Sequence, residues 1–368
     1  MASTQRSVRY AVVGLGHIAQ VAVLPAFAHA RKNSKVVAVV SGDRTKLREI
    51  AKRYRLEHAF SYDQFDACLD AVDAVYLALP NSMHAEYTIR AARAGVHVLC
   101  EKPMAVTVDE CQRMIAACRK ARVKLMVAYR LHFEPLNLAA IDIAGRGRLG
   151  ELKFFNSSFS MRVRTGDIRT RRAYGGGTLY DIGVYCINGA RNLFRSEPTR
   201  VSAISVNSGV ASLSEIDETT AATLQFSNDR IASFITSFNA ADVGAYRVVG
   251  TKGELHADPA YEYAESLSYT LTVDGKTVRK KIPKHDQFAA EIIYFSDCIV
   301  KDRQPEPSGE EGLQDVRIVQ ALYQSAKSGH PVAIRPFRKA KRPTGRQKIT
   351  RRGVRKPPLV KVQSASRD

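Results

Sequence analysis

The chain of 368 residues is long enough for two domains, and its 45% hydrophobic and 25% charged residues are typical of a globular protein. No apolar run reaches the roughly eighteen residues of a membrane span, and no apolar signal core precedes the first predicted strand, so we expect a cytoplasmic protein. The six cysteines form no CxxC pair and no cluster with histidines at zinc spacing, so we predict free thiols and no metal site.

Short β-branched runs alternate with amphipathic helical segments over residues 1–130. The predicted strands are VRYAVVG, KVVAVVS, DAVYLALP, VHVLCE and KLMVAY, and the predicted helices are one through Phe27 and those at 44–54, 83–94 and 107–121. Alternating β and α units predict a doubly wound parallel sheet, which is a Rossmann domain of the α/β class.

The pattern changes in residues 131–337. Strand-like segments follow one another at 151–163, 199–208, 219–227, 230–239, 245–250 and 267–282, and helices are predicted at 286–301 and 311–328. Consecutive strands with turn signals between them predict an α+β domain with a large open, mostly antiparallel sheet.

The last segment, residues 338–368, is strongly basic. It holds twelve of the Lys and Arg residues and one acid, Asp368, so it carries +11 of the formal net charge of +20. Few of its residues are apolar, and we therefore predict a disordered tail. Such a tail either contacts polyanions through phosphate neutralisation or is a solvated extension without a partner.

A dinucleotide fingerprint follows the first predicted strand. In GLGHIA, residues 14–19, Gly14 permits a tight turn, Gly16 lets the backbone approach a pyrophosphate, and Ala19 keeps the helix close to the strand. His17 and Ile18 complete the loop. The position between a strand and a helix predicts that this loop binds a dinucleotide cofactor.

The end of the second predicted strand indicates NADP. An NAD site usually has Asp or Glu there for the ribose 2′-hydroxyl, whereas this chain has Ser41 and Gly42, followed by Arg44 and Lys46. A hydroxyl and two cations suit a 2′-phosphate. Asp43 leaves NAD open, because a shift in strand register brings its carboxylate closer to the ribose.

Three glycines, residues 175–177, precede a segment with helical apolar spacing, in which Asp181 and Tyr185 are four residues apart and share a face. Glycines before a helix allow close approach of a ligand. From this segment alone, the alternative is a glycine turn before a core helix whose Asp and Tyr bond to neighbouring protein groups.

Five motifs in order carry a family resemblance: GLGHIA, LPNSMHAE at 79–86, EKP at 101–103, YRLHFEP at 129–135 and GGGTLYDIGVY at 175–185. Over about residues 8–334 the sequence resembles the Gfo/Idh/MocA oxidoreductases, and among them the glucose–fructose oxidoreductase-like members. The resemblance implies a Rossmann domain, a second domain with an open sheet that also makes a dimer or tetramer, and a sugar substrate.

The resemblance also implies roles for individual residues. Ser41, Lys46 and Tyr62 would lie near the adenosine and its phosphate; Leu79, Pro80, Asn81 and His84 near the nicotinamide ribose; Glu101, Lys102 and Arg130 on the cofactor floor; and Arg169 near substrate or cofactor. In the family the EKP lysine, here Lys102, pairs with the Asp and the Tyr or His of the helix after the glycines, here Asp181 and Tyr185.

These residues predict a chemistry. Oxidising a sugar hydroxyl needs a base for the proton while hydride leaves the carbon. We interpret Tyr185 as that base, Lys102 as the cation that favours its ionised form, and Asp181 as a substrate-hydroxyl acceptor and partner of Lys102.

The predicted function is an NADP-dependent oxidoreductase that converts a pyranose C1 hydroxyl to a lactone. The alternatives are the same fold acting on another polyol, a deoxy-sugar or a dihydrodiol, and a non-catalytic cofactor sensor that binds nucleic acid. Because only seven residues precede the first strand at Val8, we expect little enclosure of the cofactor and free exchange of NADP.

Overall fold

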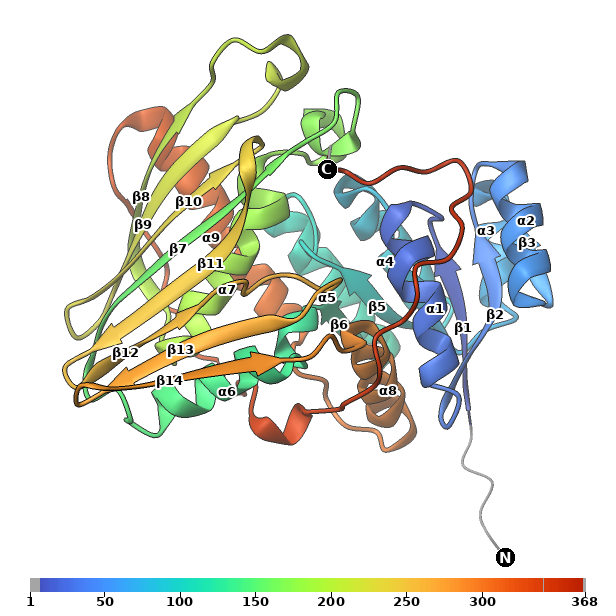
Figure 1. Cartoon of the computed structure of the whole chain (residues 1–368). Coiled ribbons are helices and arrows are strands. Elements are labelled where there is room, and N and C mark those ends of the chain that lie inside the picture. The colour runs from blue at the N-terminus through green and yellow to red at the C-terminus, as the bar shows by residue number, and fades with distance from the viewer. Residues whose placement is uncertain (1–6, 340, 367–368) are drawn as a thin grey trace, which may run out of the picture. The chain divides into compact units, whose positions relative to one another are not determined.

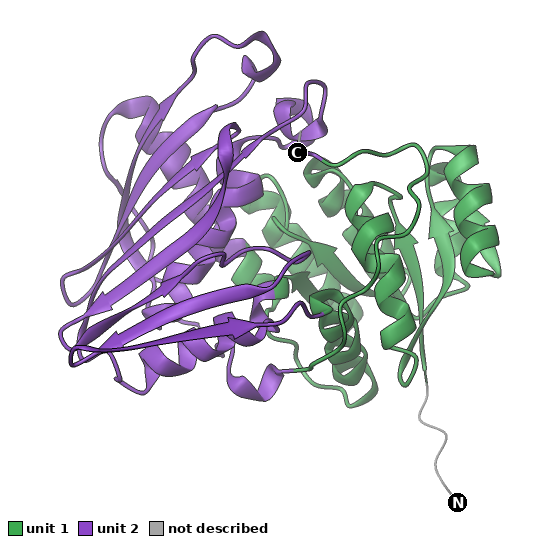
Figure 2. Ribbon diagram, viewed as in Figure 1, with its two compact units in different colours: residues 1–130, 286–312, 349–364 green, residues 131–285, 313–348, 365–368 purple. Residues whose placement is uncertain are grey.

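The computed structural model describes residues 7–339 and 341–366 (Figure 1). They form two compact units, each described by itself below (Figure 2). Unit 1 comprises residues 1–130, 286–312 and 349–364, and unit 2 comprises residues 131–285, 313–348 and 365–368. The chain passes from unit 1 to unit 2 after Arg130, and it returns to unit 1 at Asp286 and again at Ile349.

Unit 1 is built on a parallel sheet of six strands in the order β3-β2-β1-β4-β5-β6. The strands are β1 Val8–Val13, β2 Ser34–Val40, β3 His58–Phe60, β4 Ala74–Leu77, β5 His97–Glu101 and β6 Leu125–Ala128. All of β4 and β6 and most of β1 and β2 are buried, as a sheet covered on both faces requires, which explains their β-branched sequences. The predicted Rossmann topology is confirmed, and its strand order reverses between β1 and β4.

The helices of unit 1 include one that the sequence analysis assigned to the second domain. They are a π-helical turn Ala19–Val23, α1 Leu24–Ala26, α2 Arg44–Tyr54, α3 Phe65–Leu69, α4 His84–Arg93, α5 Val108–Ala121 and α8 Gln287–Val300, with 3-10 turns at Phe27–His29, Tyr62–Gln64 and Asn81–Met83. The helix that the sequence analysis assigned to the second domain is α8. Asn33 Nδ2 donates to the carbonyl oxygen of Ile293 at 2.9 Å, and the hydroxyls of Tyr10 and Ser296 are 2.7 Å apart. Its buried face therefore belongs to the core of unit 1.

Unit 2 is built on a sheet of nine strands in the order β14-β13-β12-β11-β7-β10-β9-β8-β15. The strands are β7 Leu152–Arg162, β8 Pro198–Val206, β9 Thr219–Phe226, β10 Arg230–Ser237, β11 Asn239–Gly250, β12 Gly253–Ala257, β13 Leu267–Val273, β14 Lys276–Ile282 and β15 Val332–Ala333. Only β7 and β10 pair in parallel; the other neighbours are antiparallel. The prediction of a large, mostly antiparallel sheet is confirmed.

Helices cover one face of this sheet and leave the other open (Figure 1). They are α6 Pro135–Gly145, α7 Val184–Leu193 and α9 Gly309–Ser328, of which residues 313–328 belong to unit 2, and α7 continues a π-helical turn Leu179–Gly183. The remaining 3-10 turns are Arg130–His132, Ile168–Thr170, Arg172–Tyr174, Ala211–Leu213 and Gly345–Gln347. Buried and exposed residues alternate along β7 and β9, as in a sheet covered on one face.

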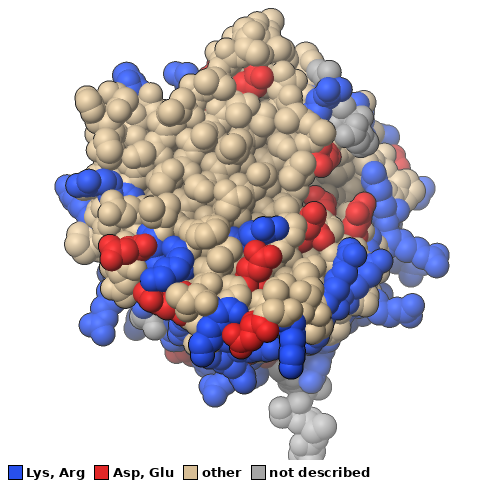
Figure 3. All heavy atoms as spheres, turned by 60° about the vertical axis from the view of Figure 1, so that its left-hand side comes forward, with Lys and Arg blue, Asp and Glu red and all other residues tan. Residues whose placement is uncertain are grey.

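The open face is the outward surface of β8, β10, β7 and β11 and is unusually apolar. Its exposed large apolar side chains are Phe154, Ile204, Val206, Ile231, Ile235 and Val243. Figure 3 shows a broad area with few charged side chains, bordered by Lys and Arg. A contiguous apolar surface of this kind commonly marks a protein interface.

The basic C-terminal segment, predicted to be disordered, is instead bonded to both units along residues 338, 339 and 341–366. Within unit 2, Arg342 binds Glu197 at 2.9 Å, and within unit 1, Arg351 donates to the His29 carbonyl at 3.3 Å. Cations of this segment bind carboxylates and backbone carbonyls of the folded units. The net charge of the segment does not predict these contacts. Residues 340, 367 and 368 of the predicted tail lie outside the described residues.

All six cysteines are buried free thiols, as predicted. The part of the chain that the structure describes holds no group of three or more His, Cys, Asp or Glu side chains suited to a metal ion. None of the helices in the described ranges combines the length and apolarity needed to cross a membrane.

A buried ion cluster holds α7 in unit 2. The Arg191 side chain is fully buried and binds Asp315 at 2.5 Å and Glu197 at 2.6 Å. Asp315 also accepts from Asn188 Nδ2 at 2.9 Å, so α7 is fixed to α9 by two of its side chains. Removing one partner of such a cluster leaves uncompensated buried charge.

We predict that Arg191→Met lowers the free energy of unfolding by about 3–5 kcal/mol, because Asp315 loses its buried counter-ion. Urea denaturation followed by circular dichroism measures the loss. The matched control is Arg113→Met, which breaks a largely exposed pair with Asp109 and should cost at most about 0.5 kcal/mol. Equal losses for the two variants would contradict the structural importance of the buried cluster.

Candidate functional site

The first loop of unit 1 is built for close backbone approach. Gly14 has φ +92°, and a Cβ there would lie 2.4 Å from the Ala78 carbonyl oxygen. A Cβ on Gly16 would meet no atom within 4 Å, so this position faces open space. Ala19 is fully buried where the helix packs against the strands, and His17 and Ile18 lie half-buried between these positions. The loop therefore fits a pyrophosphate group at the start of the helix.

The second loop resolves the question of Asp43. Its Oδ1 accepts from the backbone N–H groups of Thr45 and Lys46 at 2.8 and 3.0 Å, which makes Asp43 the N-cap of α2. The Lys46 backbone bond, aided by the charge of Lys361, lowers the pKa of Asp43. Ser41 is the residue directly after β2, and its Oγ accepts from the Asp43 N–H at 3.2 Å. Ser41, not Asp43, therefore stands directly after the strand, the position that the sequence analysis assigned to ribose recognition.

The positive charges around this loop are largely uncompensated. In the described ranges, neither the Arg44 guanidinium nor the Lys46 ammonium has an ion-pair partner within 4.0 Å. Gly42 lies against the ring of Tyr62, since a Cβ on Gly42 would be 3.3 Å from that ring. Ser41 thus follows β2, the Tyr62 ring lies against Gly42, and Arg44 and Lys46 begin α2; a hydroxyl and two cations of this kind suit a phosphate.

The third and fourth loops are tied together by a histidine. His84 is fully buried, with Nδ1 2.9 Å from the Pro103 carbonyl and Nε2 3.0 Å from the Leu79 carbonyl. Burial lowers the pKa of His84, and a neutral imidazole has one N–H to donate to one of the two carbonyls. The resemblance implied that His84 lies near the nicotinamide ribose along with Leu79, Pro80 and Asn81, and in the structure the His84 ring connects the loop of these residues to Pro103.

The EKP motif begins at the end of β5. The Tyr76 hydroxyl donates to Glu101 Oε1 at 2.8 Å, and the peptide bond between Lys102 and Pro103 is cis, which the sequence did not indicate. Burial raises the pKa of Glu101, although the charge of Lys102 opposes this effect.

Two residues of α8 belong to this region, and the sequence analysis gave them no role. Arg130 is buried and donates to Gln287 Oε1 at 2.8 Å. Glu291 is fully buried, and burial together with the charge of Glu101 raises the pKa of Glu291 well above its usual range, whereas Arg130 opposes the shift. Both residues lie in the sequence DQFAAE, residues 286–291. The sequence alone does not show that this segment belongs to unit 1, to which the chain returns at residue 286.

In unit 2, the structure pairs Asp181 with Arg169. Arg169 Nε donates to Asp181 Oδ2 at 2.8 Å, and its NH1 binds Asp167 at 3.2 Å. Although burial opposes the charge of the guanidinium, the carboxylates of Asp181 and Asp167 raise the pKa of Arg169. The pair therefore joins a donor in the 3-10 turn Ile168–Thr170 to an acceptor in the turn that leads into the helix of Tyr185.

The glycines before this helix serve contacts within the protein and not only ligand approach. A Cβ on Gly176 would lie 2.3 Å from the Arg169 carbonyl oxygen, and one on Gly177 would lie 2.4 Å from the Tyr323 hydroxyl. The Gly177 N–H donates to the Arg169 carbonyl at 3.0 Å. The glycine run thus packs the Arg169 backbone against the start of the helix.

Tyr185 lies in a cluster of aromatic rings and is 8% exposed. The centroid of its ring is 5.7 Å from that of Phe159 and 6.1 Å from that of Tyr261, and these two rings stack on each other at 4.9 Å. The Tyr261 hydroxyl is 2.8 Å from Ser157 Oγ. Fixed rings hold the Tyr185 phenol in one orientation.

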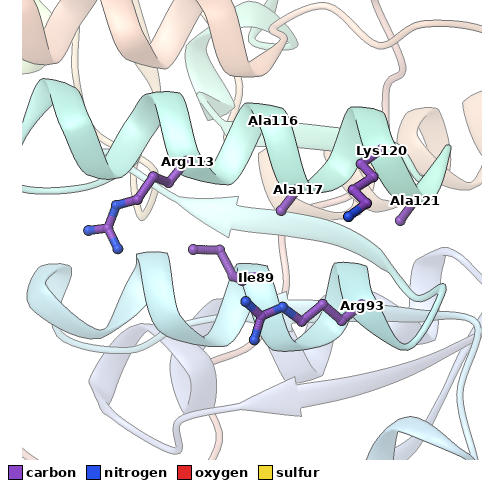
Figure 4. Close-up of a pocket in the computed structure, with 7 residues that line it drawn as sticks. All are labelled: Ile89, Arg93, Arg113, Ala116, Ala117, Lys120 and Ala121. Atoms are coloured by element: carbon purple, nitrogen blue, oxygen red, sulfur yellow. The ribbon is translucent and has the colours of Figure 1, made fainter.

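A cavity of 580 Å³ lies elsewhere in unit 1, between α4 and α5 (Figure 4). Its lining residues are Ile89, Arg93, Arg113, Ala116, Ala117, Lys120 and Ala121. None of the predicted site residues lines it.

These features define a dinucleotide-binding α/β protein with a second unit that carries an Arg–Asp pair and a buried tyrosine. Residues 8–129 match the model of an oxidoreductase family with an NAD-binding Rossmann fold, and residues 138–256 match the GFO/IDH/MocA C-terminal domain. The chain belongs to the Gfo/Idh/MocA oxidoreductase family, as the resemblance indicated.

Three relatives illustrate the range of the family. The NADP(+) D-xylose 1-dehydrogenase of Haloarcula marismortui is 30% identical over 90% of this chain and 94% of its own. The aldose–aldose oxidoreductase of Caulobacter crescentus, solved with glycerol, is 36% identical with a TM-score of 0.86 over 89% of this chain and 100% of its own. KijD10, a 3-ketoreductase of Actinomadura kijaniata solved with NADP and TDP-benzene, is 28% identical. Its TM-score is 0.79 over 87% of this chain and 98% of its own.

We predict that Gly176→Ala destabilises unit 2 by more than about 2 kcal/mol, because its Cβ collides with backbone that only a shift of Arg169 can relieve. The control is Gly345→Ala, which introduces a Cβ with no atom within 4 Å and should change stability by at most about 0.5 kcal/mol. Thermal denaturation of both variants measures the difference. Equal melting temperatures would refute the role given to Gly176.

Proposed function

We propose that the protein is an NADP-dependent sugar oxidoreductase that converts a pyranose C1 hydroxyl to a lactone. Family membership supports the reaction type, and two relatives that are named for aldose or xylose oxidation support the substrate class. The observation that carries the proposal is the bond from Arg169 to Asp181, which lies in the π-helical turn that leads into the helix of Tyr185, because this arrangement combines hydroxyl recognition with a group able to move a proton.

NADP is the proposed cofactor, on the evidence of the second loop. Asp43 is committed to capping α2 and to Lys361, whereas Arg44 and Lys46 remain without ion-pair partners in the described ranges. An ionised carboxylate at the ribose would repel a 2′-phosphate, and the residue in that place is Ser41. The NADP-dependent relatives agree with this choice.

In the proposed mechanism, Tyr185 removes the proton of the C1 hydroxyl as the C=O bond forms. The bound nicotinamide supplies the acceptor for the hydride, which leaves C1 with the electron pair of the C–H bond. An isolated phenol ionises only near pH 10, so the base needs a cation, and Lys102 is the proposed source. Asp181 accepts a substrate hydroxyl, and Arg169 fixes its carboxylate.

We also propose that the open face of the nine-stranded sheet joins copies of the chain. Its exposed apolar residues include Ile204 on β8 and Ile235 on β10, which both pair with Ala221 of the intervening β9, and this face carries few charges (Figure 3). Leaving such a surface in water is unfavourable by about 25 cal/mol for each Å² that association would bury.

We predict that Tyr185→Phe lowers kcat by a factor of about 10²–10⁴ and leaves NADP affinity nearly unchanged, because only the proton-transfer group is lost. The assay follows NADPH formation with a panel of aldoses and polyols, with NADP and NAD in parallel. The control is Tyr180→Phe, a tyrosine of the preceding turn whose ring packs on Tyr323 at 5.5 Å. A Tyr185→Phe variant that retains most of its activity would place the base elsewhere, and activity confined to non-sugar substrates would reject the substrate class.

We predict that Ile235→Asp dissociates the oligomer, because it places a charge in the centre of the apolar face. Light scattering coupled to size-exclusion chromatography measures the mass of each species. Val300→Asp, at the exposed end of α8 in unit 1, is the control and should leave the mass unchanged. A monomer in the unaltered protein, or the same mass for both variants, is the contrary result.

A further inference from the structure

The end of the chain crosses the dinucleotide-binding side of unit 1. Residues 356–364, here called the strap, run over the helix that follows the first glycine loop and reach the side of the sheet where α2 lies (Figures 1 and 2). Three contacts with unit 1 attach the strap, and each involves a residue on or next to a cofactor loop or on α2.

The first contact joins the strap to the glycine loop through one side chain. Gln20 is 1% exposed, and its Nε2 donates to the carbonyl oxygens of Leu15 and Val360, each at 3.0 Å. Its Oε1 accepts from the Val360 N–H at 2.8 Å. One buried amide therefore satisfies both backbone groups of Val360, in the pattern of a strand pair, and binds the strap to the loop proposed to hold the pyrophosphate.

The other two contacts are on and just before α2. Arg53 NH1 donates to the Pro358 carbonyl at 2.6 Å, and Lys361 Nζ lies 3.5 Å from Asp43 Oδ2. Asp43 is the N-cap of α2 and adjoins Ser41 and Arg44 in the loop after β2. Lys361 is thus the third cation at the place where the adenosine 2′-phosphate is proposed to bind.

Positive charges outnumber negative charges near the loop after β2. Lys361 binds the Asp43 carboxylate, whose other oxygen accepts from backbone N–H groups, whereas Arg44 and Lys46, at the start of α2, have no ion-pair partner in the described ranges. A phosphate group with two negative charges restores the balance and accepts charge-assisted hydrogen bonds from these cations.

We infer that the strap is part of the cofactor site: Lys361 binds the 2′-phosphate of NADP, and the strap encloses the adenosine end of the cofactor. This inference rests on the proposed NADP site. It differs from the expectation of a freely exchanging cofactor drawn from the sequence, because a segment fixed at Gln20 and Arg53 opposes escape. Lys361 therefore contributes to the choice of NADP over NAD, and the strap as a whole contributes to retention of either cofactor.

The test separates these two effects with the full-length protein. Isothermal titration calorimetry measures the dissociation constants of NADP and NAD, and stopped-flow displacement of bound NADPH and NADH measures their escape. Lys361→Gln should raise the dissociation constant of NADP about tenfold, the effect of one charge-assisted hydrogen bond, and that of NAD less than about twofold. Gln20→Ala should speed escape of both reduced cofactors about fivefold or more, because it releases Val360.

Lys356→Gln is the matched control. Lys356 is an exposed cation of the strap that has no ion-pair partner in the described ranges, and its substitution removes the same charge from the same segment. NADP affinity lowered equally by Lys356→Gln and Lys361→Gln would reduce the effect to net charge and overturn the role of Lys361. NADP binding and escape unchanged in both Lys361→Gln and Gln20→Ala would reject the strap but keep the proposed cofactor, whereas an unaltered protein that binds neither cofactor would reject both.

Discussion

The candidate site depends on one constraint of the six-stranded sheet: its strands are parallel, so their carboxyl ends meet at one edge. The loops that begin at Gly14, Ser41, Ala78 and Glu101 are far apart in sequence but leave this same edge. The approach of Gly14 to the Ala78 carbonyl is possible only without a Cβ, and it brings the first and third loops together. These loops follow β1 and β4, and the strand order reverses between those two strands. In such sheets a crevice for a dinucleotide forms at this point.

Unit 2 provides a different kind of rigidity. The helix that carries Asp181 and Tyr185 is fixed at its start by the close approach of Gly176 to Arg169, and farther along by the buried ions of Arg191 and Asp315. Aromatic rings confine the phenol of Tyr185. A proton-transfer group needs a fixed direction towards its substrate, and contacts of this kind would supply it for the proposed role of Tyr185.

Much of this arrangement could be predicted from local sequence. The β-branched runs and the glycine fingerprint are local signals, and they led to the sheet, the cofactor loop and the helix after the glycines. The predictions that were wrong concerned segments whose position depends on partners far away in the sequence. The helix α8 joins unit 1 through Asn33 and Tyr10, and the basic tail is held by Gln20 and Glu197 instead of being disordered.

The structure also gives some of the predicted site residues backbone partners that the sequence does not reveal. The His84 ring lies between the Pro103 and Leu79 carbonyls, and Asp43 caps α2. Composition and spacing identify such residue types but not the carbonyl or N–H group that each one meets. Glu291 is a further case, since its burial follows from the return of the chain to unit 1.

The central claim is that hydride moves between the C1 carbon of a sugar and NADP. The most direct measurement is to incubate the protein with NADP and D-glucose or D-xylose carrying deuterium only at C1, and to examine the NADPH by NMR. The account predicts deuterium on the nicotinamide ring, formation of the aldonolactone and a primary isotope effect on the chemical step. NADPH formed without deuterium would show that the hydride comes from another carbon and would contradict the assignment of C1.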